Sequence, residues 1–197
     1  MIRVLAVLLL ATLPLRAEEF PALYAVTGVA SDDVLNIRAL PDAGSAIIGS
    51  LAADAADVEV IEIAGNWALV NTGERAGYAA TRYLARLSGP DWTALQNPLS
   101  CLGTEPFWSL TIDPGTMSAR FSSPETPDAS AVEIVHQWPG QPGARTAAVG
   151  LPSGTVVLQP LQCSDGMSDR VYGISADLFR TAPDTSRLSG CCRLVPP

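Results

Sequence analysis

The chain has 197 residues, 12 basic and 20 acidic side chains and a formal net charge of -8, and 48% of its residues are hydrophobic. This length and apolar content fit a folded protein of one medium or two small domains and exclude a disordered chain. The negative charge leaves no electrostatic footprint for nucleic acid or anionic lipid. The sole histidine, His136, argues against sites that need several imidazoles, so the sequence favours a role without catalysis, cofactor or metal.

The first 17 residues have the pattern of an export signal. Arg3 gives a positive start, and the apolar run from Val4 to Leu13 is shorter than the roughly 20 residues of a membrane-spanning helix. Pro14 ends the run, and Ala17 closes an imperfect small-residue cleavage site. The alternative is a buried N-terminal helix. We expect removal of residues 1–17 and a periplasmic or secreted protein without stable membrane insertion.

The four cysteines, Cys101, Cys163, Cys191 and Cys192, have no C-x-x-C spacing. In an oxidising compartment an even number of cysteines indicates disulfides rather than a metal or redox site. If Cys191 and Cys192 lie in a strand, they point to opposite faces and need different partners. A Cys163–Cys191 bridge would contribute about 3.5 kcal/mol in the chain-entropy model, and it leaves Cys101–Cys192 as the favoured second pair. The other connectivities stay open.

Residues 22–87 consist of short apolar runs separated by turn residues. Val34 to Arg38 alternates apolar and polar side chains, and Pro41 to Ser45 has turn composition. Val58 to Ile63 and Trp67 to Val70 flank a hairpin turn. Short strands at this spacing predict a small barrel.

Five short motifs follow one another through this segment: Asn36-Ile37-Arg38-Ala39-Leu40-Pro41, Gly49-Ser50-Leu51, Gly65-Asn66-Trp67-Ala68, Gly77-Tyr78 and Tyr83-Leu84. In order and spacing they resemble a bacterial SH3-type domain. The resemblance implies an SH3-like barrel that binds cell-wall peptide or an envelope protein and catalyses nothing. Leu40 is a departure, because the family usually has glycine before the proline of the first motif.

Aromatic side chains with a polar tip favour recognition surfaces, so the candidate ligand-binding residues of this segment are Asn36, Arg38, Trp67, Tyr78 and Tyr83. The alternative makes Trp67 and Tyr78 core anchors of a small barrel and Arg38 a structural ion-pair partner. The segment has eight acidic and four basic residues. This balance disfavours anionic wall polymers but accepts a peptide with free amines.

The remaining chain divides into a linker and a second β domain. The composition of residues 88–98 predicts a linker, with one helical turn over 91–95 that is capped by Asp91. Residues 99–197 return to short strands broken by proline and glycine, which predicts an antiparallel barrel or sandwich. The predicted fold class is therefore all-β: an SH3-like barrel followed by a C-terminal β domain with disulfides.

Two dense motifs mark the C-terminal segment: Gly103-Thr104-Glu105-Pro106-Phe107-Trp108-Ser109-Leu110, and Cys163-Ser164-Asp165-Gly166-Met167-Ser168-Asp169-Arg170 with Tyr172, closed by Gly190-Cys191. Together they resemble an uncharacterised family of bacterial envelope proteins, which implies no mechanism. Gly173 stands where the family often has proline, and Cys192 where a small residue is usual; the extra Cys192 supports a paired Cys101. The candidate site residues of these motifs are Glu105, Phe107, Trp108, Asp165, Met167, Asp169 and Tyr172.

Three carboxylates in these motifs, Glu105, Asp165 and Asp169, have the oxygen chemistry of a calcium site. Gly166 directly after the first aspartate does not match an EF-hand. We interpret Asp165 as a turn former and Asp169 as a partner of Arg170 or a cap on backbone amides. Glu105 is either a buried acid or a hydrogen-bonded structural acid, and His136 is expected to be an ordinary, partly exposed residue.

The leading functional hypothesis is a non-catalytic envelope protein whose SH3-like domain binds cell-wall peptide or a protein partner, with the C-terminal domain as a second recognition or inhibitory unit. Phe107, Trp108 and Tyr172 are the candidate contacts of that second unit. One alternative is a carrier whose C-terminal barrel encloses a small apolar ligand. The other is a cell-wall hydrolase that uses Glu105 with Asp165 or Asp169.

Overall fold

The computed structural model describes residues 19–127, 130–141 and 145–195. The predicted export signal, residues 1–17, lies outside them. Within these ranges the chain is all-β with two short 3-10 helices, which confirms the predicted fold class. No helix in these ranges has the length and apolar character needed to span a membrane.

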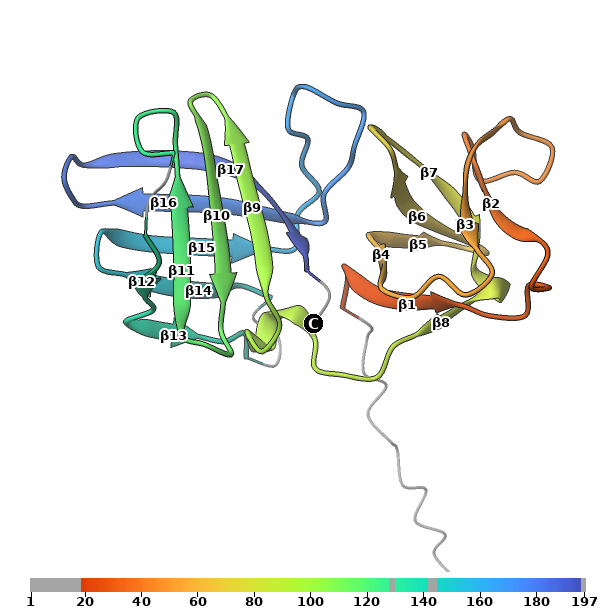
Figure 1. The fold of residues 1–197 in the computed structure, drawn as a ribbon, viewed down its shortest axis with the longest axis horizontal. Helices are drawn as coiled ribbons and strands as arrows, with labels where there is room; N and C mark the ends of the chain where they lie inside the picture. The colour runs from red at the N-terminus through yellow and green to blue at the C-terminus, as the bar shows by residue number, and fades with distance from the viewer. Residues whose placement is uncertain (1–18, 128–129, 142–144, 196–197) are drawn as a thin grey trace, which may run out of the picture.

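The N-terminal part forms two small antiparallel sheets, which we call the N-terminal sheets (Figure 1). The first has the order β4-β1-β8 and contains β1 (Ala22–Val26), β4 (Val58–Val60) and β8 (Leu84–Arg86). The second has the order β3-β2-β7-β6-β5 and contains β2 (Val34–Arg38), β3 (Ile47–Ala52), β5 (Glu62–Ala64), β6 (Trp67–Thr72) and β7 (Arg75–Ala80). The 3-10 helix η1 (Thr81–Tyr83) links β7 to β8.

Alternating side chains of these strands fill one core between the two sheets. Leu35 and Ile37 of β2 point into it, as the alternation predicts, together with Val60 of β4. The predicted single strand over 58–63 is divided between the two sheets. Ile61 lies buried at the corner and donates its N–H to Leu69 O at 2.9 Å, so consecutive residues are buried where alternation would expose one.

The C-terminal part is a nine-stranded antiparallel sheet that curls into a half-barrel, with strand order β12-β11-β10-β9-β17-β16-β15-β14-β13. Its strands are β9 (Leu99–Thr104), β10 (Phe107–Asp113), β11 (Ser118–Ser122), β12 (Val132–Glu133), β13 (His136–Trp138), β14 (Ala147–Leu151), β15 (Gly154–Gln159), β16 (Ile174–Arg180) and β17 (Ser186–Leu194).

The two edges of this sheet are joined through the chain itself. β12 and β13 lie at opposite ends of the strand order, yet only Ile134 and Val135 separate them in sequence. Ile134 donates its N–H to Met117 O and Val135 donates to Gly150 O, both at 2.8 Å. This connection draws the edges together, so the predicted barrel-or-sandwich alternative resolves to a curled single sheet.

The predicted linker packs as part of the half-barrel. Trp92, in the 3-10 helix η2 (Trp92–Ala94), and Leu95 are buried in the half-barrel core. The predicted helical turn is therefore present, but the predicted cap at Asp91 is wrong, because its side chain makes no capping bond. The Asp91 carboxylate instead forms an ion pair with Arg86 at 2.7 Å. A hydrogen bond to a charged guanidinium is stronger than one to a neutral backbone amide, so the carboxylate turns to Arg86.

The position of the Trp108 ring explains why two residues of the motifs are glycine. Its indole lies across Gly103 of β9 and Gly190 of β17, so a Cβ at Gly103 would collide with Nε1 and one at Gly190 would lie 2.7 Å from the ring. The Trp108 N–H is buried without a hydrogen-bond partner in the described part of the chain. The indole therefore serves packing, and the two glycines provide the space it occupies.

The disulfides join Cys101 to Cys192 and Cys163 to Cys191, the two pairs that the sequence favoured. Cys101 and Cys192 are directly paired in the ladder between β9 and β17 and lie in the half-barrel core. The neighbouring Cys191 bonds Cys163 of the 160–173 loop, so adjacent cysteines do find different partners. Two disulfides indicate an oxidising, extracytoplasmic location.

Candidate functional site

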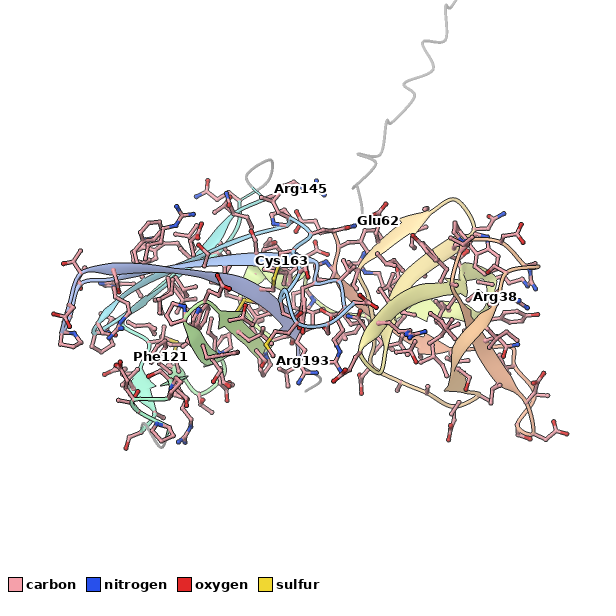
Figure 2. The ribbon with its side chains drawn as sticks, turned by 90° about the horizontal axis from the view of Figure 1, so that it is seen from above. Arg38, Glu62, Phe121, Arg145, Cys163 and Arg193 are labelled. Carbon is pink, nitrogen blue, oxygen red and sulfur yellow. A yellow bond between two sulfur atoms is a disulfide. The ribbon has the colours of Figure 1, made fainter. Side chains whose placement is uncertain are left out.

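A groove of about 280 Å³ on the N-terminal sheets collects four of the five residues predicted for this segment. Asn36 and Arg38 come from β2, Trp67 begins β6 and Tyr83 ends η1. Tyr78 lies on β7, next to Arg38 in the ladder, but does not line the groove. Figure 2 shows Arg38 on the side of the N-terminal sheets that faces away from the half-barrel.

The charged groups of this groove are available to a ligand. Arg38 donates from Nη1 to Ser45 O at 2.7 Å and pairs with no carboxylate of the described residues, so the alternative of a structural ion pair is wrong. The Arg82 guanidinium lies 4.7 Å from the Tyr83 ring centre. Neither arginine forms an ion pair with the acidic residues that the structure describes. Sequence reasoning missed Arg82 and Asp33, which also line the groove; the arginine next to Tyr83 was the available signal.

The two C-terminal motifs meet at the 160–173 loop. Thr104 donates its hydroxyl to Asp165 O at 2.7 Å. The Asp165 carboxylate accepts from the Met167 and Ser168 amides, the Ser168 hydroxyl and the Tyr172 hydroxyl. Desolvation opposes ionisation, but these hydrogen bonds together hold the pKa of Asp165 below its ordinary value. Asp165 therefore shapes the turn, as interpreted from the sequence.

The other carboxylates of the motifs have different surroundings. Glu105 is exposed in the turn between β9 and β10, so the buried-acid alternative is wrong. Asp169 binds through its backbone: its N–H donates to Glu74 O and its carbonyl accepts from Ala76 N. Arg170 donates to Gly73 O at 2.6 Å, and no Arg170–Asp169 ion pair forms. The described ranges hold no group of three or more His, Cys, Asp or Glu side chains placed to bind a metal.

The aromatic and sulfur side chains of the motifs divide into two sets. Trp108 and Tyr172 are 4% and 2% exposed, and desolvation by this burial raises the pKa of Tyr172. Phe107 and Met167 are 53% and 70% exposed. Of these four side chains, only Phe107 and Met167 can therefore contact a partner at the surface. His136 is exposed on β13 beside Trp138, as expected.

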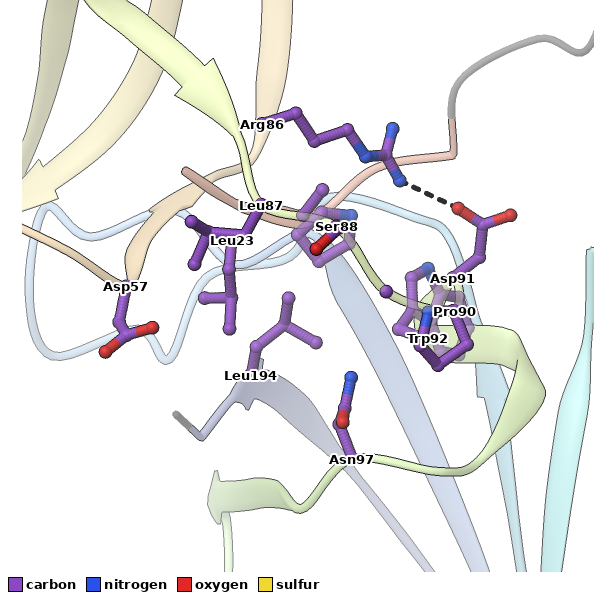
Figure 3. A pocket seen from close by; sticks show the side chains of 13 residues that line it. Leu23, Asp57, Arg86, Leu87, Ser88, Pro90, Asp91, Trp92, Asn97 and Leu194 are labelled. Carbon is purple, nitrogen blue, oxygen red and sulfur yellow. Dashed lines mark hydrogen bonds and ion pairs between the residues drawn. The ribbon is translucent and has the colours of Figure 1, made fainter. Parts of the chain in front are cut away.

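Two further cavities lie where the N-terminal sheets meet the half-barrel. One of about 150 Å³ follows the 86–92 segment and contains the Arg86–Asp91 ion pair (Figure 3). The other, of about 400 Å³, contains Glu59 of β4, which accepts a hydrogen bond from Leu194 N at 2.9 Å. Burial raises the pKa of Glu59 to about 7, against the lowering effects of this hydrogen bond and of Arg193. Sequence reasoning gave no sign of this residue.

No family model, curated protein or solved structure matches this chain.

Proposed function

We propose that the N-terminal sheets form an SH3-like recognition module that binds a short peptide of the cell wall or of an envelope protein, in the periplasm or outside the cell. The supporting observation is the convergence of Asn36, Arg38, Trp67 and Tyr83, from three separate elements, on one groove. Residues distant in sequence that meet in a concave surface with mixed polar and aromatic character form the ordinary design of a binding site.

The groove chemistry favours a ligand with both a carboxylate and an amine. Arg38 and Arg82 offer guanidinium groups without acidic partners in the described chain, and guanidinium groups suit carboxylates. Asp33 complements an amine on the same ligand. Trp67 and Tyr83 cover the apolar part between them. Cell-wall peptides carry both free carboxylates and free amines.

Two observations favour recognition over the alternatives. The half-barrel interior is packed with side chains such as Leu110, Leu158 and Ile174, all fully buried, where a carrier would need an open cavity. The Asp165 carboxylate accepts four hydrogen bonds within its own loop, whereas a hydrolytic carboxylate must face its substrate.

The test is co-sedimentation of the full mature chain with purified cell-wall sacculi, together with calorimetry on a soluble wall peptide. We expect Arg38→Gln and Trp67→Ala each to weaken binding about ten-fold, as truncation of a central binding residue does. Arg145→Gln and Trp138→Ala remove matched exposed side chains of the half-barrel and should bind as the parent does. Equal losses in all four variants, or retention in both groove variants, would contradict the proposal.

A further inference from the structure

A second groove lies on the outer face of the half-barrel, where the two C-terminal motifs meet. Phe107, Leu161 and Met167 are 53%, 55% and 70% exposed. They border two adjoining cavities of about 780 and 1140 Å³, which share Phe107, Met167 and Leu102. We call this surface the motif groove. Large apolar side chains exposed together around a concave surface mark an interaction site.

The motif groove is acidic at both ends. Glu74 lines one cavity and Glu105 the other, and both side chains are exposed. Neither has a basic partner in the part of the chain that the structure describes. Because the whole chain has a net charge of -8, its field reinforces this local sign.

Two arginines, Arg170 and Arg187, also line the groove. Arg187 donates from Nε and Nη2 to the two carboxylate oxygens of Asp177, each at 3.0 Å. Arg170 donates to Gly73 O at 2.6 Å. Arg170 keeps its positive charge, because a backbone carbonyl does not neutralise it, but Glu74, Glu105 and Asp165 outnumber it and the groove is negative as a whole.

From this complementarity we propose that the motif groove binds a segment of a partner protein in which apolar side chains stand next to lysine or arginine. The apolar side chains would cover Phe107, Leu161 and Met167, and the cationic groups would reach Glu74 and Glu105. Methionine adapts its shape to different apolar partners at low cost, which suits a surface that receives a peptide. This site is separate from the groove of the N-terminal sheets.

One end of the groove depends on the contact between the two halves of the molecule. Glu74 belongs to the N-terminal sheets, and its carbonyl accepts the Asp169 N–H of the 160–173 loop at 2.8 Å. The loop itself is fixed by the Cys163–Cys191 disulfide and by the Asp165 turn. In Figure 1 it stands as the blue loop between the two halves. A surface held in this way loses little freedom on binding.

The experiment measures fluorescence anisotropy of a labelled, amidated peptide of alternating leucine and lysine, added to the full mature chain. A peptide with glutamate in place of lysine is the charge control. We expect the lysine peptide alone to bind, and more weakly at high salt, because exposed ion pairs are screened. Phe107→Ser combined with Met167→Ser should weaken binding about ten-fold, and Glu74→Gln combined with Glu105→Gln about five-fold.

Val135→Ser and Glu133→Gln are the matched control variants, because both side chains are exposed on the β12–β13 segment, outside the groove. Circular dichroism of each variant checks that the fold is kept. Equal binding of both peptides, failure of the lysine peptide to bind, or equal effects of groove and control variants would overturn the proposal. So would a dimer in sedimentation equilibrium that the Phe107→Ser and Met167→Ser pair dissolves, since a second copy would then be the occupant.

Discussion

Asn71 and Val171 form a reciprocal pair across the contact between the N-terminal sheets and the half-barrel. The Asn71 Nδ2 donates to Val171 O at 2.8 Å, and Val171 N donates to Asn71 Oδ1 at 3.1 Å. The side-chain amide thus pairs with the N–H and the C=O of Val171, as the backbone of a neighbouring strand would. One residue of β6 satisfies both backbone groups of a loop residue 100 positions later.

Asn71→Ala leaves both backbone groups of Val171 without their partner. We expect a loss of about 2 kcal/mol in the free energy of unfolding, because unsatisfied, partly buried polar groups carry a desolvation penalty. Urea unfolding followed by tryptophan fluorescence measures it. Gln96→Ala removes an exposed amide and is the control, with a change within about 0.5 kcal/mol. Equal effects of the two substitutions would show that the pair contributes nothing to stability.

Local sequence pattern was enough for several features of this fold. Alternation along β17 sends Cys191 and Cys192 to opposite faces, and this alone requires separate partners. The Asp165-Gly166 pair predicts the turn that the carboxylate does stabilise. Such features depend on neighbours within a few residues, so one sequence contains them.

Features that depend on distant contacts were not predictable in this way. The predicted helix cap at Asp91 was wrong because the Asp91 carboxylate forms an ion pair with Arg86. The predicted linker 88–98 packs against the half-barrel because Trp92 is buried in the half-barrel core. In the sequence, Glu59 is an ordinary polar residue of an edge strand, and only its contact with Leu194 at the end of β17 distinguishes it. One end of the motif groove likewise comes from Glu74, which belongs to a different part of the sequence.

Gly173→Ala tests one of these distant contacts. A Cβ at this position would lie 2.9 Å from Cδ of Pro21, which is itself buried. We expect destabilisation of about 1–2 kcal/mol, the ordinary cost of overpacking. The matched control is Gly115→Ala, whose Cβ would meet only Asp113 Oδ1 at 3.4 Å. Differential scanning calorimetry measures both; a Gly173→Ala protein as stable as the control would mean that Pro21 moves aside freely.

The two disulfides should differ in what their removal costs. Cys101–Cys192 spans 91 residues and Cys163–Cys191 spans 28, for which the chain-entropy model gives about 4.5 and about 3.5 kcal/mol. The first pair also fills the core, so its double alanine variant should have the lower melting temperature. The second pair fixes the 160–173 loop, so its double alanine variant should also lose motif-groove binding. The reverse order of melting temperatures would contradict this reasoning.

Glu59 predicts how stability depends on pH. The groups that line its cavity include Asp57, Arg170, Tyr172 and Arg193, and burial is the main cause of the raised pKa. Below pH 4.5 the carboxyl is protonated in both the folded and the unfolded chain, so it imposes no penalty. Between 4.5 and about 7 the unfolded chain releases the proton and the folded chain keeps it, so stability falls as pH rises.

Glu59→Gln should remove this dependence while its side-chain oxygen still accepts the Leu194 N–H. A carboxyl whose pKa rises from 4.5 to about 7 costs about 3 kcal/mol once it is ionised. The variant should therefore match the parent near pH 4 and exceed its free energy of unfolding at pH 8. Asp113 and Asp165, whose pKa values are lowered, act only at more acidic pH. Urea unfolding of parent and variant at several pH values between 4 and 8 measures this difference. If the free energies of unfolding of the two proteins change with pH in the same way, Glu59 ionises freely in the folded protein.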